Sequence, residues 1–249
     1  MRAYYNEIEP YAAQWLRNLI VAGHLAPGDV DERDVRDVKP DDLEGYAQCH
    51  FFAGLGGWSY ALRLAGWPDD RPVWTGSCPC QPFSMAGKRQ GFADERHLWP
   101  AWFRLISQRR PATIFGEQVA SAVDWLSLVR SDLESLDYAV GTIPVQAASA
   151  GAFHLRDRFW FVANGMRTGL EIRPGERSDN ESQFPSLERD GGIEWLRCAD
   201  GKFRPVKPGI RLLARGVPAR VGKLRAFGNA IVPQVAAEFI KACFSMGVT

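Results

Sequence analysis

The chain has 249 residues, 46% of them hydrophobic, and nearly balanced charge with 30 basic and 29 acidic side chains. This is enough for one large domain, or one domain with a small insert. The sequence has no apolar run that approaches ~18 residues, and its N-terminus has no apolar secretory segment. We therefore expect a cytoplasmic protein that neither spans nor binds a membrane. Five cysteines without paired C-x-x-C spacing argue against a disulfide framework and a structural zinc site, so we expect no metal.

Helical and strand-like stretches alternate along the first half of the chain, which predicts a doubly wound α/β sheet. Apolar periodicity predicts helices over residues 10–22, 58–65, 99–107, 122–136 and 233–243. Short apolar runs predict strands over residues 49–53, 73–76, 113–115 and 159–163. The polar stretch 164–192 is typical of a loop or a small irregular insert.

Cys80 stands between two prolines, shortly after the apolar run 72–76. A buried strand that ends in a rigid loop is a common place for reactive groups in α/β enzymes, so Cys80 is a candidate nucleophile. The alternative is a buried packing cysteine, which is the commoner role of this residue. We expect packing roles for Cys49 and Cys243, and for Cys78 a bystander role at the strand end.

A glycine-rich turn, Phe52-Ala53-Gly54-Leu55-Gly56-Gly57, separates a short strand from the helical run 58–65. Such a turn can bring backbone amides close to a ligand at a helix N-terminus. It can equally serve only to pack a helix tightly on a sheet, so taken alone it is weak support for a binding site.

A basic segment spans residues 195–225, which contain nine Lys or Arg residues and a single acidic residue, Asp200. The segment also contains Trp195, Phe203 and several Pro and Gly residues, a composition that favours a surface neutralising phosphates. The alternative is an ordinary solvated face.

Several motifs in this order resemble those of the DNA cytosine-5 methyltransferases. They are Pro79-Cys80-Gln81, Glu117-Gln118-Val119, His154-Leu155-Arg156-Asp157-Arg158 and Gly228-Asn229. The resemblance covers nearly the whole chain. It implies a Rossmann-like S-adenosylmethionine-dependent methyltransferase sheet with a small, basic target-recognition region. The implied organisation is a catalytic and cofactor-binding domain over 1–164, a target-recognition region over 165–208, and a segment over 209–249 that returns to the catalytic domain.

The resemblance implies methyl transfer to C5 of a cytosine that is flipped out of DNA. Cys80 would add to C6, which makes C5 nucleophilic, and Glu117 would protonate N3. Arg156 and Arg158 would hold the base carbonyl and a phosphate. The alternatives are a surface carboxylate for Glu117 and structural salt bridges for the two arginines.

For the cofactor, the resemblance implies contacts from the glycine turn and from two acidic segments. Here both segments precede the turn, so the chain order would be second, third, first and fourth strand of the family's sheet. The expected contacts are Phe52, Ala53, Gly54, Leu55, Gly56, Gly57, Glu7, Ile8, Asp29, Val30, Pro79, Asn229 and Ala230. The alternative makes residues 1–30 an unrelated helical extension.

Three positions depart from the family pattern: Gln118 replaces the usual Asn, His154 the usual Gln, and His50 the usual Asp before the glycine turn. Because Gln offers the same amide chemistry as Asn from one methylene further out, geometry rather than chemistry is changed at Gln118.

The expected partner is double-stranded DNA, and we expect the protein to bind it as a monomer. The resemblance is to small phage or bacterial members of the family, which implies a role in restriction and modification. A mobile loop over 84–94 would close on the substrate. The expected DNA contacts are Gln81, Ser84, Lys88, Arg89, Lys202, Arg204 and Lys207. Two alternatives remain open, namely a tRNA cytosine-5 methyltransferase and a catalytically idle DNA-binding homologue.

Overall fold

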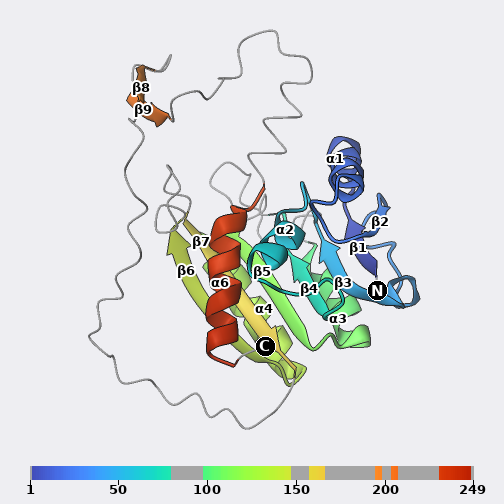
Figure 1. Cartoon of the computed structure of the whole chain (residues 1–249). Coiled ribbons are helices and arrows are strands. Elements are labelled where there is room, and N and C mark those ends of the chain that lie inside the picture. The colour runs from blue at the N-terminus through green and yellow to red at the C-terminus, as the bar shows by residue number, and fades with distance from the viewer. Residues whose placement is uncertain are drawn as a thin grey trace.

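A seven-stranded sheet forms the centre of the computed structural model, which describes residues 2–79, 98–146, 157–165, 194–197, 203–206 and 230–247. The strand order is β2-β1-β3-β4-β5-β7-β6 (Figure 1). Strands β1 to β5 run parallel, and β7 runs antiparallel to both β5 and β6. The strands are β1 Arg2–Asn6, β2 Gly28–Asp31, β3 Tyr46–Phe51, β4 Val73–Gly76, β5 Thr113–Val119, β6 Ala139–Gln146 and β7 Asp157–Asn164.

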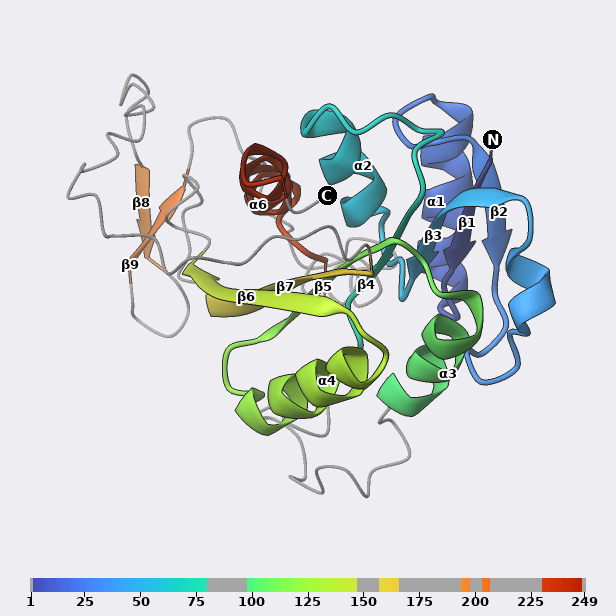
Figure 2. The ribbon, with the colours of Figure 1, turned by 90° about the horizontal axis from the view of Figure 1, so that it is seen from below.

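Helices cover both faces of this sheet, as Figure 2 shows. On one face lie α1 (Pro10–Val21), α2 (Gly57–Leu64) and α6 (Pro233–Ser245), and on the other lie α3 (Trp99–Arg109) and α4 (Val123–Ser135). A short 3-10 helix, η1 (Pro40–Leu43), precedes β3. The structure therefore confirms the predicted α/β class with helices on both faces.

The N-terminal strands confirm the exchanged strand order. The doubly wound arrangement places the third, second, first and fourth strands side by side. In this chain those positions belong to β2, β1, β3 and β4. The alternative of an unrelated helical extension over 1–30 is wrong, because β1 pairs with both β2 and β3 inside the sheet.

The core is divided by the sheet into one large cluster on each side. On the α3/α4 side Trp99, Trp102 and Trp125 are fully buried, and on the α2/α6 side Trp58 and Trp160 pack with the apolar side of α6. Cys49 and Cys243 are buried within these clusters, as predicted. Burial raises the pKa of the Cys49 thiol to about 12, so it is a packing residue and not a reactive one.

The ends of the first helix follow from its sequence. The Glu9 carboxylate accepts hydrogen bonds from the backbone N–H groups of Tyr11 and Ala12, and Pro10 occupies the first turn, where its missing N–H costs nothing. The predicted helices and strands lie within a few residues of those observed. The strands over 194–197 and 203–206 and the 3-10 helix η1 were not predicted, and neither was β6. It contains Gly141 and Pro144, which lack strand propensity, and it forms an edge of the sheet.

Two further strands, β8 (Glu194–Arg197) and β9 (Phe203–Val206), pair antiparallel within the region predicted to recognise DNA. Among the described residues, none of the helices combines the length and apolar content needed to cross a bilayer. The described residues also contain no group of three or more His, Cys, Asp or Glu side chains placed to hold a metal ion.

Candidate active site

The candidate site lies at the end of the sheet where the parallel strands have their carboxyl ends, which we call the carboxyl edge. Glu7 follows β1, the glycine turn follows β3, and Ser77 to Pro79 follow β4. Glu117 lies near the end of β5, and Arg158 lies at the start of the antiparallel β7, so both reach the same edge. Ligands of open α/β sheets bind at this edge, where the connections leave in opposite directions.

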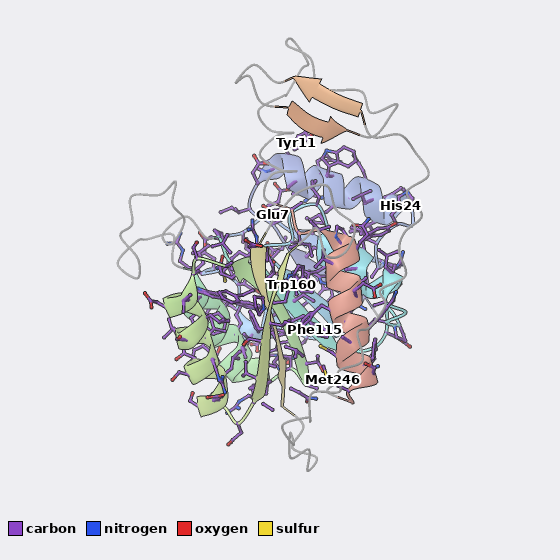
Figure 3. The ribbon with its side chains drawn as sticks, turned by 90° about the vertical axis from the view of Figure 1, so that its left-hand side faces the viewer. Glu7, Tyr11, His24, Phe115, Trp160 and Met246 are labelled. Atoms are coloured by element: carbon purple, nitrogen blue, oxygen red, sulfur yellow. The ribbon has the colours of Figure 1, made fainter. Side chains whose placement is uncertain are left out.

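Glu7 is joined directly to the glycine turn. Its Oε2 accepts a hydrogen bond from the Gly54 amide at 2.7 Å, and its Oε1 accepts one from the Glu9 amide at 2.9 Å. Burial raises the pKa of this carboxyl, while the two backbone hydrogen bonds oppose the rise. Figure 3 shows Glu7 at the upper edge of the sheet. Its neighbour Ile8 is 59% exposed.

Two residues of the glycine turn have backbone angles that favour glycine. Gly54 and Gly56 have left-handed backbone angles, with φ of 55° and 77°. A Cβ built on Gly54 would meet nothing within 4 Å among the described residues. Phe52 also has a left-handed φ, of 52°. A non-glycine residue held in this region is strained, and such strain is found often at ligand sites.

The C-terminal segment reaches the same turn. A Cβ on Gly57 would come within 2.6 Å of the Ile231 side chain, so Gly57 permits this close approach. Ala230, predicted as a cofactor contact, immediately precedes Ile231 and is half-buried.

Glu117 and Arg158 form a close ion pair at the same edge. Arg158 Nε lies 2.6 Å from Glu117 Oε1, and the two side chains are 20% and 8% exposed. The antiparallel pairing of β7 with β5 creates this contact, since Arg158 lies opposite Val119 and Trp160 lies opposite Glu117. The two predicted catalytic residues that the structure describes are therefore brought together.

The segment that leads toward Cys80 is held on both sides. Trp58 Nε1 donates to Ser77 Oγ at 3.0 Å, and Gln118 Nε2 donates to the Cys78 carbonyl at 3.4 Å. Cys78 itself is 5% exposed, and burial raises the pKa of its thiol well above the ordinary value. A thiol in this state is a poor nucleophile, in keeping with the bystander role predicted for Cys78.

Asp29 does not lie at this edge. In the strand register it stands opposite Tyr4, and its carboxylate accepts hydrogen bonds from Arg2 and Tyr46, residues that begin β1 and β3. The acid that β2 brings to the carboxyl edge is Asp31, which stands opposite Asn6 and accepts from the Tyr4 hydroxyl at 2.7 Å. Val30, also predicted as a contact, is half-buried and packs against a small buried cluster that includes Tyr5 and Leu16. The Gly-Asp-Val pattern favours Asp29, whereas Asp31 is the acid at the carboxyl end of β2. The length of the strand is the signal that identifies Asp31.

His50 takes the place of the family's usual Asp inside the sheet. It is 1% exposed, its Nδ1 lies 2.8 Å from Thr75 Oγ1, and its Nε2 lies 3.3 Å from Gln48 Oε1. Burial lowers its pKa to about 3, so the ring is neutral at physiological pH. His50 is therefore a structural polar residue that joins β3 to β4.

Pro79 is exposed at the end of the described segment. The other predicted site residues lie outside the described residues: Cys80, Gln81, Ser84, Lys88, Arg89, His154, Arg156, Lys202, Lys207 and Asn229. The loop over 84–94 lies outside them too, and of Arg204 only the backbone is described, in β9.

Comparison with known proteins connects this geometry to a family. The family model described as C-5 cytosine-specific DNA methylase matches residues 66–197, just over half of the chain. The matched part includes β4, β5 and β7, and it excludes residues 1–65, in which the strand order is exchanged.

Individual relatives align over part of their length. The Type II methyltransferase M.HgiBI of Herpetosiphon aurantiacus is 27% identical over 52% of this chain and 39% of its own. M.HhaI of Haemophilus parahaemolyticus is 25% identical over 55% of this chain and 54% of its own. The chain thus spans about half the length of these relatives, or less. A solved DNMT2 mutant from Spodoptera frugiperda is 17% identical over 71% of this chain and 45% of its own, with a TM-score of 0.46. On the extent of the family match, the chain belongs to the C-5 cytosine-specific DNA methylases.

Proposed function

We propose that the chain transfers a methyl group from S-adenosylmethionine to C5 of cytosine in double-stranded DNA, through a covalent bond from Cys80 to C6. The observation that carries this proposal is the Glu117–Arg158 pair, 2.6 Å apart at the edge where the segment leading into Cys80 leaves β4. An acid, a cation and a thiol-bearing loop at one sheet edge are the groups that this reaction requires.

The residues around Glu7 fit the adenosyl part of the cofactor. A carboxylate at the end of β1 can accept hydrogen bonds from ribose hydroxyls, and no described residue lies within 4 Å of a Cβ built on the neighbouring Gly54. Ile8 offers an exposed apolar surface for the adenine ring. We assign the acid of β2 at this pocket to Asp31 in place of Asp29. Bound here, S-adenosylmethionine supplies an electrophilic methyl group.

Cys80 activates the base. Cytosine C5 is too weakly nucleophilic to take a methyl group unaided, so the thiolate first adds to C6 and the ring becomes an enamine with electron density at C5. After methylation, C5 loses its proton to a base, the C6–sulfur bond breaks, and N3 returns the proton that it received from Glu117, which restores the aromatic ring and the free thiolate. A neighbouring cation favours the thiolate, and Arg158 is the described cation at this edge that suits this role.

Glu117 assists the addition by giving a proton to N3 of the base, which withdraws electrons from C6. Such general acid catalysis typically contributes ~10²–10⁴ in rate. We assign the contact with the base carbonyl to Arg158, which pairs with Glu117. Because a stacked cytosine cannot reach these groups, the base must leave the duplex at a cost of a few kcal/mol.

DNA is the favoured substrate, because the matched family is described as a DNA methylase and because the segment 195–225 carries nine basic residues against one acid. We propose that the chain acts as a monomer in the cytoplasm of a bacterial host, in the modification role that the names of its relatives indicate.

The direct test is transfer of a radiolabelled methyl group to unmethylated duplex DNA. We expect the wild-type chain to label cytosine C5, Cys80→Ala to show no transfer, and Cys78→Ala, the matched control, to keep most of it. Equal losses in the two variants would contradict the assignment of the nucleophile. A tRNA substrate is offered in parallel, and labelling of tRNA without DNA would replace DNA by RNA as the substrate.

A further inference from the structure

Trp58 directly follows the Gly54–Gly57 part of the glycine turn, and its side chain contacts residues near two other parts of the candidate site. It is the second residue of α2, directly after the glycine turn, and it is 3% exposed. Its indole N–H donates to Ser77 Oγ at 3.0 Å, three residues before Cys80. Its position therefore links the turn assigned to the cofactor with the segment that carries the proposed nucleophile.

The ring of Trp58 also supports the strands that carry the ion pair. It stacks with Phe115, with centroids 6.2 Å apart and 17° between planes, and meets Trp160 edge-on at 5.4 Å. Side chains two residues apart on a strand share a face, so Phe115 lies on the face of Glu117 and Trp160 on the face of Arg158. Figure 3 shows Trp160 and Phe115 below Glu7, beside α6.

We propose that Trp58 is a positioning residue, which sets the Ser77–Cys78 segment relative to the glycine turn and the Glu117–Arg158 pair. This inference rests on the proposed function only in that it takes Cys80 and Glu117 as the reacting groups. The indole N–H is the part of Trp58 that phenylalanine cannot replace, since Phe keeps most of the ring packing and lacks the donor.

The chain offers a matched control for this single hydrogen bond. Trp160 belongs to the same aromatic cluster and is 2% exposed, but its Nε1 has no hydrogen-bond partner within the part of the chain that the structure describes. Trp58→Phe and Trp160→Phe remove the same atoms from the same cluster. Only the first removes the hydrogen bond to Ser77.

The first measurement is amide hydrogen exchange of the peptide spanning residues 73–80, which requires no substrate. The net contribution of one hydrogen bond corresponds to about a three- to tenfold change in an equilibrium. We expect exchange at Ser77 and Cys78 to accelerate by about this factor in Trp58→Phe and in Ser77→Ala, and to stay within about twofold of wild type in Trp160→Phe. Equal exchange in Trp58→Phe and Trp160→Phe would overturn the proposal.

The second measurement is methyl transfer by the same variants. We expect kcat to fall about three- to tenfold in Trp58→Phe and in Ser77→Ala, with KM for DNA within about twofold of wild type. The double variant should be no slower than either single variant, because both remove the same interaction. Additive losses would contradict the proposal. If the wild-type chain transfers no methyl group, the proposed function fails, while the exchange result still decides whether Trp58 holds the segment.

Discussion

Replacing Glu7 by Gln tests the proposed contact between this carboxylate and the cofactor. Both carboxylate oxygens already accept a backbone N–H, from Gly54 at 2.7 Å and from Glu9 at 2.9 Å. A glutamine keeps one acceptor oxygen and has no charge. Because a hydrogen bond to a charged acceptor contributes about 1.5–3 kcal/mol, we expect the dissociation constant for S-adenosylmethionine to rise about ten- to a hundredfold.

The pH dependence of binding gives a second, independent signature. Burial raises the pKa of Glu7, so its carboxylate takes up a proton at a higher pH than an exposed glutamate does. We therefore expect the affinity of the wild-type chain to fall as the pH is lowered through that raised pKa. Glu7→Gln has no such group, and its affinity should not change over the same range.

The same shift determines how Glu7 acts on stability. A carboxyl whose pKa is raised by folding favours the folded state at low pH, and this contribution is lost as the pH rises through the raised value. At neutral pH the buried charge is thus a cost, which Glu7→Gln removes. The variant also leaves one backbone N–H without its acceptor, which costs about 1–3 kcal/mol. The two effects oppose each other, so we expect the variant to remain folded.

Calorimetric titration of folded protein with S-adenosylmethionine measures the affinity, with Glu9→Gln as the matched control. Glu9 is the neighbouring carboxylate, but it caps α1 by accepting from Tyr11 and Ala12. We expect Glu9→Gln to lose at most about 1 kcal/mol of stability and to bind the cofactor within about twofold of wild type. Wild-type affinity in Glu7→Gln would refute the assignment of Glu7 to a cofactor contact.

Three further predictions concern other parts of the molecule. Glu117→Gln should lower single-turnover methyl transfer by ~10²–10⁴ while DNA affinity stays within a few-fold, and normal transfer would mean that another group protonates N3. Removal of three basic side chains should flatten the plot of log affinity against log salt by about 2–3, and an unchanged slope would place the DNA contacts elsewhere. The three are Lys202, Arg204 and Lys207. His50 has a pKa lowered to about 3 by burial, so stability is greatest above pH ~6.5 and should fall by about 2 kcal/mol on acidification to pH ~5. Urea unfolding of His50→Asn should lack this fall, and an equal fall would assign the acid sensitivity to another group.

Much of the fold could be predicted because its elements carry local signals. The helices α1, α3, α4 and α6 follow apolar periodicity, and β4 follows an apolar run bounded by Pro72 and Gly76. The exchanged strand order could be predicted from the order of the motifs that resemble those of the family, because each of these motifs lies on or next to one strand. Strand β6 was not predicted, because Gly141 and Pro144 interrupt its pattern and an edge strand has no need of a continuous apolar run.

The sequence by itself determined the residue types at the site: a thiol between prolines, a strand-end carboxylate, a glycine turn, and an acid near the N-terminus. Only the tertiary structure decided which of them meet. Asp29 and Asp31 are two residues apart on one strand, about 7 Å, and the register of β2 with β1 brings Asp31, not Asp29, to the carboxyl edge of the sheet. The Glu117–Arg158 pair and the Trp58–Ser77 hydrogen bond likewise join residues from different strands and helices. Local patterns encode the period and the ends of each element, whereas contacts between elements depend on register and packing, which no short stretch of sequence contains.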